Sequence, residues 1–165
     1  TGNLEACYLL GDFGVVCSGS RAHLTRPVQT LDFTDETRQG LPFYGGNVTY
    51  RLSVAAPGGP LALEVPRYRG ALVAVALDGQ RVGRIVYAPH RLTFDCPAGT
   101  HEVTVTVFGN RINTFGCLHN CDPDYPYYGP AAWRTEGKQF SYEYCLRPTG
   151  LLAAPRLYRS LAGPI

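Results

Sequence analysis

The sequence contains no methionine, only one tryptophan and no runs of charged residues. Fifteen basic and thirteen acidic side chains leave a net charge of +2, so no charged face is predicted that would attract nucleic acid or an anionic membrane surface. The longest nearly continuous apolar run, residues 71–77, is far too short to cross a bilayer. The N-terminus also lacks an apolar segment typical of a signal peptide. We therefore expect a soluble protein with neither nucleic acid nor a membrane as its partner.

The chain is short enough to form one domain. Its 165 residues can bury a hydrophobic core without covalent cross-links. Because Thr1 is not an initiator methionine and methionine is absent throughout, we expect a processed product or a piece of a longer protein. The prediction is a single domain over residues 1–165.

Six cysteines could form three disulfides, in fifteen possible pairings. However, Cys7, Cys96 and Cys145 lie inside or at the ends of strand-like runs, where a free cysteine acts as a small apolar residue. A domain of this size also needs no covalent cross-link. We therefore predict reduced thiols.

The sequence also lacks the usual signatures of catalysis and cofactor binding. It contains no Gly-x-Ser-x-Gly motif and no phosphate-binding glycine loop. Asp122, Asp124 and Glu136 are the best candidates for the two carboxylates of a glycosidase, but aspartate beside proline is typical of a turn. Residues 117–122 hold zinc-ligand types in a Cys-x-His-x-Cys-Asp pattern, yet the spacing is too short and no second ligand pair follows. We predict no catalytic residue, no metal and no cofactor.

Alternation of apolar and polar residues is the dominant pattern in the chain. Over residues 48–54 every second residue is apolar, which is typical of a half-buried strand. Residues 71–77 are apolar at every position, which predicts a central strand covered on both faces. The pair Asp78-Gly79 favours a type I′ hairpin turn, with a partner strand over residues 81–87.

The remaining elements are expected to be short strands, one helical turn and glycine- or proline-rich connections. Further strands are predicted at residues 4–10, 13–17, 61–65, 91–96, 101–108 and 140–146. Residues 57–60 are predicted to form a loop and residues 97–100 a hairpin turn. Thr34 is expected to cap a helical turn that ends at Gly40. Together these elements predict an all-β fold, an antiparallel β-sandwich.

Three stretches resemble one family of domains, in the family's order. Gly40-Leu-Pro-Phe-Tyr-Gly-Gly-Asn-Val-Thr-Tyr-Arg51 resembles the corner-and-strand motif of sugar-binding β-sandwich domains in large bacterial glycoside hydrolases. Val75-Ala-Leu-Asp-Gly-Gln-Arg-Val-Gly83 resembles their V-x-V-N-G-x-x-V-G hairpin, with Asp78 in place of the usual asparagine. Residues 101–115 are similar to a strand that ends in an asparagine-rich turn. The first forty residues and residues 117–128 match nothing in that family.

The resemblance implies a galactose-binding-like jelly roll, as found in beta-galactosidase-type and rhamnosidase-type enzymes. In that family the jelly roll lies beside a separate catalytic barrel and carries no catalytic pair. The resemblance therefore implies a non-catalytic carbohydrate-binding or accessory domain, in the bacterial cytoplasm or secreted. Its partners would be weakly bound carbohydrate, the catalytic domain of the parent chain, or both. Two alternatives stay open: a ligand-free interdomain scaffold and a self-contained glycoside hydrolase.

One long segment, residues 109–139, has no strand-length alternation and is rich in aromatic and polar side chains. So long a connection inside a compact domain is usually functional or packed as a loop. Aromatic rings stack on the apolar faces of sugars, while amides and guanidinium groups bond sugar hydroxyls. The candidate carbohydrate-binding residues are Trp133, Tyr127, Tyr128, Arg111, Asn113 and His119. The alternative for each is structural, either packing the loop on the sheet or docking it on a neighbouring domain.

Overall fold

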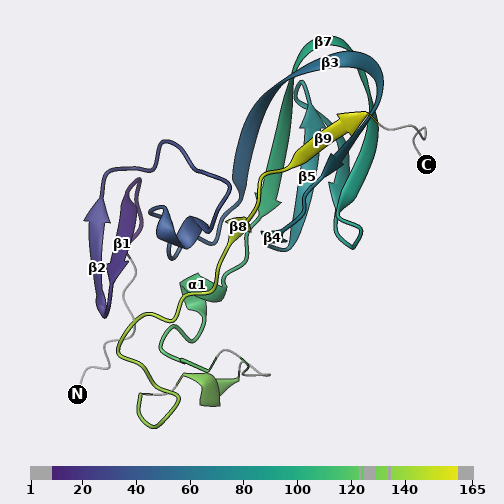
Figure 1. The fold of residues 1–165 in the computed structure, drawn as a ribbon. Helices are drawn as coiled ribbons and strands as arrows, with labels where there is room; N and C mark the ends of the chain where they lie inside the picture. Colours follow the sequence, from purple (N-terminus) through teal and green to yellow (C-terminus); the bar gives the residue numbers. More distant parts are fainter. Residues whose placement is uncertain (1–8, 123, 125–128, 134, 160–165) are drawn as a thin grey trace.

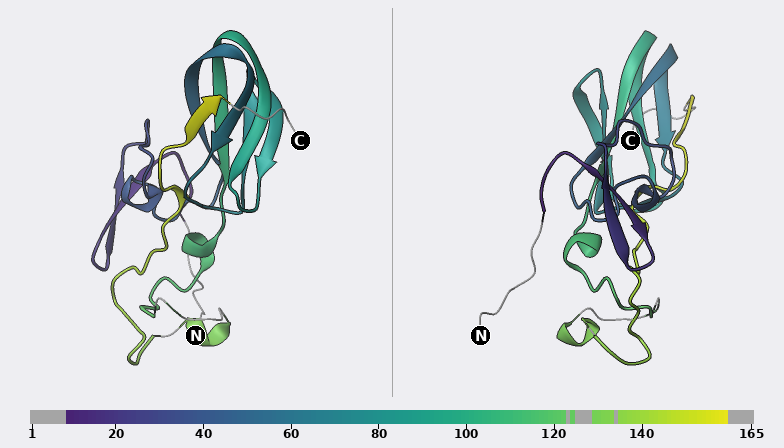
Figure 2. Two further views of the ribbon diagram at one scale, coloured as in Figure 1. Left: turned by 45° about the vertical axis from the view of Figure 1, so that its right-hand side comes forward. Right: turned by 90° about the vertical axis from the view of Figure 1, so that its left-hand side faces the viewer.

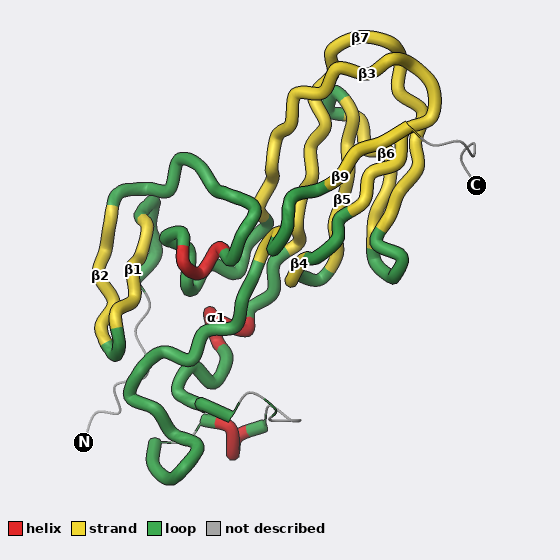
Figure 3. Tube along the Cα trace, in the orientation of Figure 1, coloured by secondary structure: helices red, strands yellow, loops and turns green. Residues whose placement is uncertain are grey.

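The computed structural model describes residues 9–122, 124, 129–133 and 135–159. In this part of the chain the protein is mostly β, and its sheets are antiparallel, as predicted (Figure 1 and Figure 3). The largest sheet has the order β6-β5-β7-β3-β9. Its strands are β3 (Val48–Glu64), β5 (Leu72–Leu77), β6 (Gln80–Ile85), β7 (Arg91–Phe108) and β9 (Arg156–Arg159).

Two smaller sheets and three short helices complete the described structure. The strands are β1 (Gly14–Ser18) with β2 (Arg21–Thr25), and β4 (Tyr68–Arg69) with β8 (Gly150–Leu151). The helices are η1 (Glu36–Arg38), α1 (Ile112–Phe115) and η2 (Pro130–Ala132). A search of the described residues found no helix with the length and apolarity that a membrane span requires.

The two longest strands, β3 and β7, pair with each other over their whole length. The register runs from Val48 opposite Val107 to Glu64 opposite Arg91. Both strands arch over in the middle (Figure 1). One hydrophobic cluster then joins residues from the two ends of each strand. Its members include Tyr50, Leu61, Leu63, Phe94, Cys96, Val103 and Val105.

Because of this arch, two predicted turns of the chain are wrong. The loop predicted at residues 57–60 and the hairpin predicted at residues 97–100 are both interior parts of long strands. The two stretches overlap across the pairing, since Pro57 lies opposite Ala98. Proline and glycine in a strand mark a bend as readily as a turn, because glycine adopts backbone angles closed to other residues. Gly58, with φ of 89°, takes such an angle here.

The strand predicted at residues 71–77 lies inside the sheet as expected, but it is not buried on both faces as predicted. β5 lies between β6 and β7, so the strand is interior to the sheet. Asp78 and Gly79 form the tip of the β5–β6 hairpin with φ of 48° and 81°, the positive angles of a type I′ turn. Val73 and Val75 are fully buried, whereas Ala74, on the opposite face, is half-buried. One face of the strand therefore packs in the core, and the other is only partly covered.

The N-terminal region forms a hairpin that stands beside the large sheet (Figure 2). β1 confirms the strand predicted at residues 13–17. The strand predicted at residues 4–10 lies largely outside the described residues, and Leu10 is exposed. The predicted helical turn exists, but its cap is Asp35 in place of Thr34. The Asp35 carboxylate accepts a hydrogen bond from the N–H of Thr37 at 3.0 Å.

Residues 140–146, predicted as a strand, are a loop. In the described chain the one β-type pairing of this segment is an isolated bridge between Asn120 and Phe140. Alternation alone does not make a strand, because a strand also needs a partner edge. Cys145 is therefore half-buried in a loop, whereas Cys96 is buried in the core as predicted. The five described cysteines are free thiols, and Cys7 lies outside the described residues.

Candidate functional site

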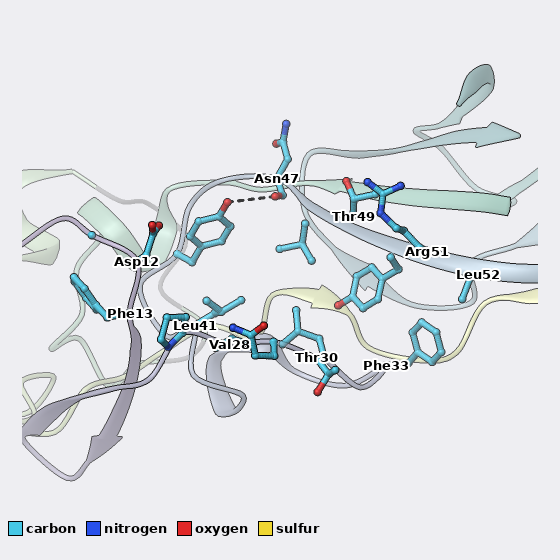
Figure 4. Close-up of a pocket in the computed structure, with 17 residues that line it drawn as sticks. Asp12, Phe13, Val28, Thr30, Phe33, Leu41, Asn47, Thr49, Arg51 and Leu52 are labelled. Atoms are coloured by element: carbon cyan, nitrogen blue, oxygen red, sulfur yellow. Dashed lines mark hydrogen bonds between the residues drawn. The ribbon is translucent and has the colours of Figure 1, made fainter. Parts of the chain in front are cut away.

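A groove of about 940 Å³ separates the N-terminal region from the first half of β3 (Figure 4). Residues 27–31 and Phe33 form one wall, residues 47–52 form the other, and residues 11–13 also line the groove. Thr30 and Phe33 lie across the gap from β3 (Figure 4). The groove was not predicted, because its two walls come together only through the tertiary fold.

The β3 wall turns its backbone edge toward the groove. Side chains of a strand alternate between the two faces, yet the consecutive residues 47–52 all line the groove. A second groove, of about 410 Å³, is lined by residues 53–55 and Pro57 of β3 and by residues 157–159 of β9. β7 occupies one edge of β3 throughout, while β9 occupies the other edge only at residues 61–64. In the described chain, residues 48–56 of β3 therefore have a strand on one side only.

The groove mixes aromatic rings with hydrogen-bonding groups. Its lining includes the rings of Phe13, Phe33, Tyr44 and Tyr50 and the polar side chains of Asp12, Gln29, Thr30, Asn47, Thr49 and Arg51. The Tyr44 hydroxyl donates to the carbonyl of Asn47 at 3.3 Å. Asp12 is the one carboxylate among the described lining residues, so this groove lacks the pair that glycoside hydrolysis needs.

A buried carboxylate sits behind the groove and joins the N-terminal region to the sheet. Glu36 is only 5% exposed, and its Oε1 accepts a hydrogen bond from the Tyr50 hydroxyl at 2.8 Å. Burial raises the pKa of Glu36, and the bond from Tyr50 opposes that effect in part. The N–H of Glu36 donates to the carbonyl of Thr149 at 3.2 Å. Gly150 packs directly against the Glu36 side chain. Tyr50 and Gly150 are distant in sequence from Glu36, so no local pattern pointed to this cluster.

The predicted carbohydrate-binding residues occupy different environments. Tyr127 and Tyr128 lie outside the described residues. Trp133 follows η2 and is 51% exposed. Arg111 precedes α1 and is exposed, with its guanidinium carbon 5.7 Å from the centre of the Phe115 ring. Trp133 and Arg111 are thus the two described members of the set with substantial exposure.

Asn113 and His119 make contacts within the loop. Asn113 is 2% exposed; its Nδ2 donates to the carbonyl of Arg147 at 2.6 Å and its Oδ1 accepts from the Arg147 N–H at 2.9 Å. The Nδ1 of His119 lies 2.9 Å from the carbonyl oxygen of Ser141, and its ring packs 5.3 Å from that of Tyr144. These contacts tie the loop to residues 140–147. Asn113 thus uses its amide for a contact within the loop, and the contact with sugar hydroxyls stays a prediction.

The loop acids belong to a turn. One carboxylate oxygen of Asp122 accepts from the N–H of Asp124 at 3.0 Å, and the other accepts from the side-chain amide of Gln139 at 2.8 Å. Glu136 is exposed. Within the part of the chain that the structure describes, no group of three or more His, Cys, Asp or Glu residues could hold a metal ion. This applies to the described Cys-x-His-x-Cys-Asp segment as well.

Comparisons with known proteins assign no relative to this chain. No family model matches it, and no curated protein or solved structure matches it either. The resemblance in residues 40–51, 75–83 and 101–115 therefore stays a prediction. A functional conclusion has to rest on the chain's own residues and geometry.

Proposed function

We propose that this protein is a non-catalytic carbohydrate-binding accessory domain of a bacterial glycoside hydrolase, with a galactose-binding-like jelly roll. The observation that carries the proposal is the exposure of three aromatic rings within residues 111–142. Trp133 is 51% exposed, Phe115 49% and Tyr142 77%. Aromatic rings with this much exposure can form a binding surface, since a folded domain covers much of its apolar area. Aromatic faces are also what sugar rings stack upon.

Polar groups near these rings can orient a sugar. Arg111 holds its guanidinium group near the Phe115 ring, where its N–H groups can donate to sugar hydroxyls. Phe115 and Tyr142 were not among the predicted residues, and exposure in the tertiary structure was needed to find them. Because exposed faces bury little of a ligand, affinity should be near millimolar, or about −4 kcal/mol.

Titration of the isotopically labelled chain with galactosides, rhamnosides and glucosides should perturb NMR signals of residues 111–142, including the Trp133 indole. Trp133→Ala should weaken binding by about tenfold, because it removes the largest apolar face. Tyr87→Ala is the matched control, since Tyr87 is 83% exposed but lies beyond β6. Perturbations confined to the groove beside β3 would contradict this placement. No perturbation at millimolar sugar would favour the ligand-free scaffold.

The isolated chain should not hydrolyse nitrophenyl glycosides. Among the described residues the groove presents a single carboxylate, Asp12, and the two oxygens of Asp122 accept hydrogen bonds from the Asp124 N–H and the Gln139 amide. Hydrolysis of a glycosidic bond needs an acid and a nucleophile or base on opposite sides of that bond. Turnover that is lost in Asp122→Asn or Asp124→Asn would contradict this and favour a self-contained hydrolase.

A second candidate is the ligand-free interdomain scaffold. It is favoured by the internal use of Asn113 and His119, whose polar groups tie the loop to residues 140–147. Under this alternative the exposed rings would pack against a neighbouring domain. The same sugar titration separates the two functions.

A further inference from the structure

In the part of the chain that the structure describes, the first half of β3 has a long edge with no neighbouring strand. β7 pairs with one side of residues 48–56, and β9 does not reach the other side. At about 3.3 Å per residue, nine residues span about 30 Å. Outside the pairing with β7, none of these residues takes part in a backbone hydrogen bond within the described chain. Among the described residues, the backbone N–H and C=O groups on the open side therefore have no hydrogen-bond partner.

Natural sheets normally protect such edges with bulges, charges, proline or a covering segment. The opposite edge of this sheet, strand β6, is protected in this way. β6 is short, shows a register shift against β5 and carries exposed Arg81 and Arg84. Residues 48–56 keep a constant register with β7 and contain neither proline nor lysine; their one charged side chain, Arg51, is paired with Glu102 of β7 at 3.0 Å. Among the described residues, Phe33 and residues 27–31 line the groove opposite this edge.

The same edge already accepts a strand further along. β9 pairs antiparallel with residues 61–64 of β3. Along the open part, Val48, Leu52 and Val54 are half-buried apolar residues that pack against the core. Thr49, Arg51 and Ser53 point to the other face and are exposed. An added strand would find an apolar row on one side and a polar row on the other.

We propose that the open edge of β3 binds one extended peptide strand of a partner polypeptide, seated between residues 48–56 and residues 27–33. Main-chain hydrogen bonds would provide affinity, and alternate side chains would provide specificity. The partner should alternate apolar and polar residues, with an acidic side chain in its polar row beside Arg51. This inference goes beyond the proposed function, because it requires no carbohydrate.

A peptide fits this edge better than a second copy of the chain does. Residues 27–31 and Phe33 line the groove opposite residues 47–52 (Figure 4), and the Phe33 ring lies 5.5 Å from the Tyr50 ring. In a second copy the same wall lies opposite the same edge. Two edges that each face such a wall cannot reach the separation of about 4.8 Å that strand pairing requires, whereas a single strand can enter the groove.

The probe is a synthetic peptide that copies residues 101–108 of β7, His-Glu-Val-Thr-Val-Thr-Val-Phe, with terminal lysines for solubility. This sequence alternates valine with polar residues, and its glutamate corresponds to Glu102, which pairs with Arg51 at 3.0 Å in the protein. Added to the full 165-residue chain, it should slow hydrogen exchange at alternate amides of residues 48–56 by about tenfold. A scrambled peptide of the same composition should not.

A charge swap tests the partner chemistry. Arg51→Glu should weaken binding of the probe by about tenfold, and a probe with lysine in place of its glutamate should restore binding to that variant. Unchanged exchange at the core amides of Val103 and Val105 would verify that the variant is folded. Equal protection by the scrambled peptide, or protection at β2 or β6 instead, would overturn the inference. Protection of the same amides without peptide, growing with protein concentration, would overturn the choice of partner in favour of a second copy.

Discussion

Gly150→Ala should lower the free energy of unfolding by about 3–5 kcal/mol, as measured by urea denaturation. Gly150 has φ of 86°, a left-handed angle that disfavours alanine. A Cβ at this position would also overlap the carboxylate of Glu36, which is 5% exposed and cannot swing into solvent. The substitution should therefore separate residues 149–151 from η1 and loosen the N-terminal region from the sheet.

Gly79→Ala is the matched control. Gly79 has φ of 81°, but nothing lies within 4 Å of a Cβ built there. Its replacement should lower stability by about 1–2 kcal/mol, the effect of the backbone angle alone. The excess loss in Gly150→Ala then measures the overlap with Glu36. The double variant Glu36→Ala/Gly150→Ala should lose less stability than the two single variants lose together, because Glu36→Ala removes the group that clashes with the new Cβ. Equal losses at Gly150 and Gly79 would contradict this account.

Glu36→Ala should lower the free energy of unfolding by about 2–4 kcal/mol. It leaves the hydroxyl of Tyr50, which is 7% exposed, without its acceptor. Glu36→Gln keeps an oxygen at the acceptor position and removes the buried charge, so its stability at neutral pH should lie within about 1 kcal/mol of the parent. Urea denaturation of both variants checks this. A loss in the glutamine variant as large as in the alanine variant would show that the charge itself stabilises the cluster.

The pH dependence of the same variants has a definite sign. Burial raises the pKa of Glu36 above its ordinary value, so the folded state holds this proton more tightly than the unfolded state. The stability that Glu36 adds by binding this proton is fully present below the unfolded pKa of about 4.3. It is lost as the pH rises through the folded pKa. Stability of the parent relative to Glu36→Gln should therefore fall between acid and neutral pH. A difference that does not change with pH would contradict a raised pKa.

Asp78 should change the stability with pH in the opposite direction, and it is present both in the parent and in Glu36→Gln. Its carboxylate bonds the Nδ1 of His101 at 2.7 Å, which holds the pKa of Asp78 below its ordinary value. Stability from this group is present above about pH 3.9 and is lost in acid. Because Asp78 is unchanged in Glu36→Gln, its effect cancels in the comparison of the two proteins.

Local patterns determined the parts of the fold that depend on neighbours in sequence. Alternation over residues 48–54 predicted the faces of β3, and Asp78-Gly79 predicted the hairpin tip with its positive φ angles. The apolar run at residues 71–77 likewise predicted an interior strand. In each case the cause lies within a few residues: the two-residue period of a strand, or the backbone angles that a tight turn requires.

Tertiary structure decided the rest, because the partners are far apart in the chain. Proline and glycine at residues 57–60 and 97–100 could end a strand or bend it, and their mutual pairing made both of them bends. Alternation at residues 140–146 predicted a strand that lacks a partner edge. Asn113 carried the polarity of a ligand contact, but the fold gave its amide to Arg147. The groove and the open edge beside β3 likewise depend on segments far apart in the chain, because β9 pairs with β3 only at residues 61–64 and the opposite wall comes from residues 27–31 and Phe33.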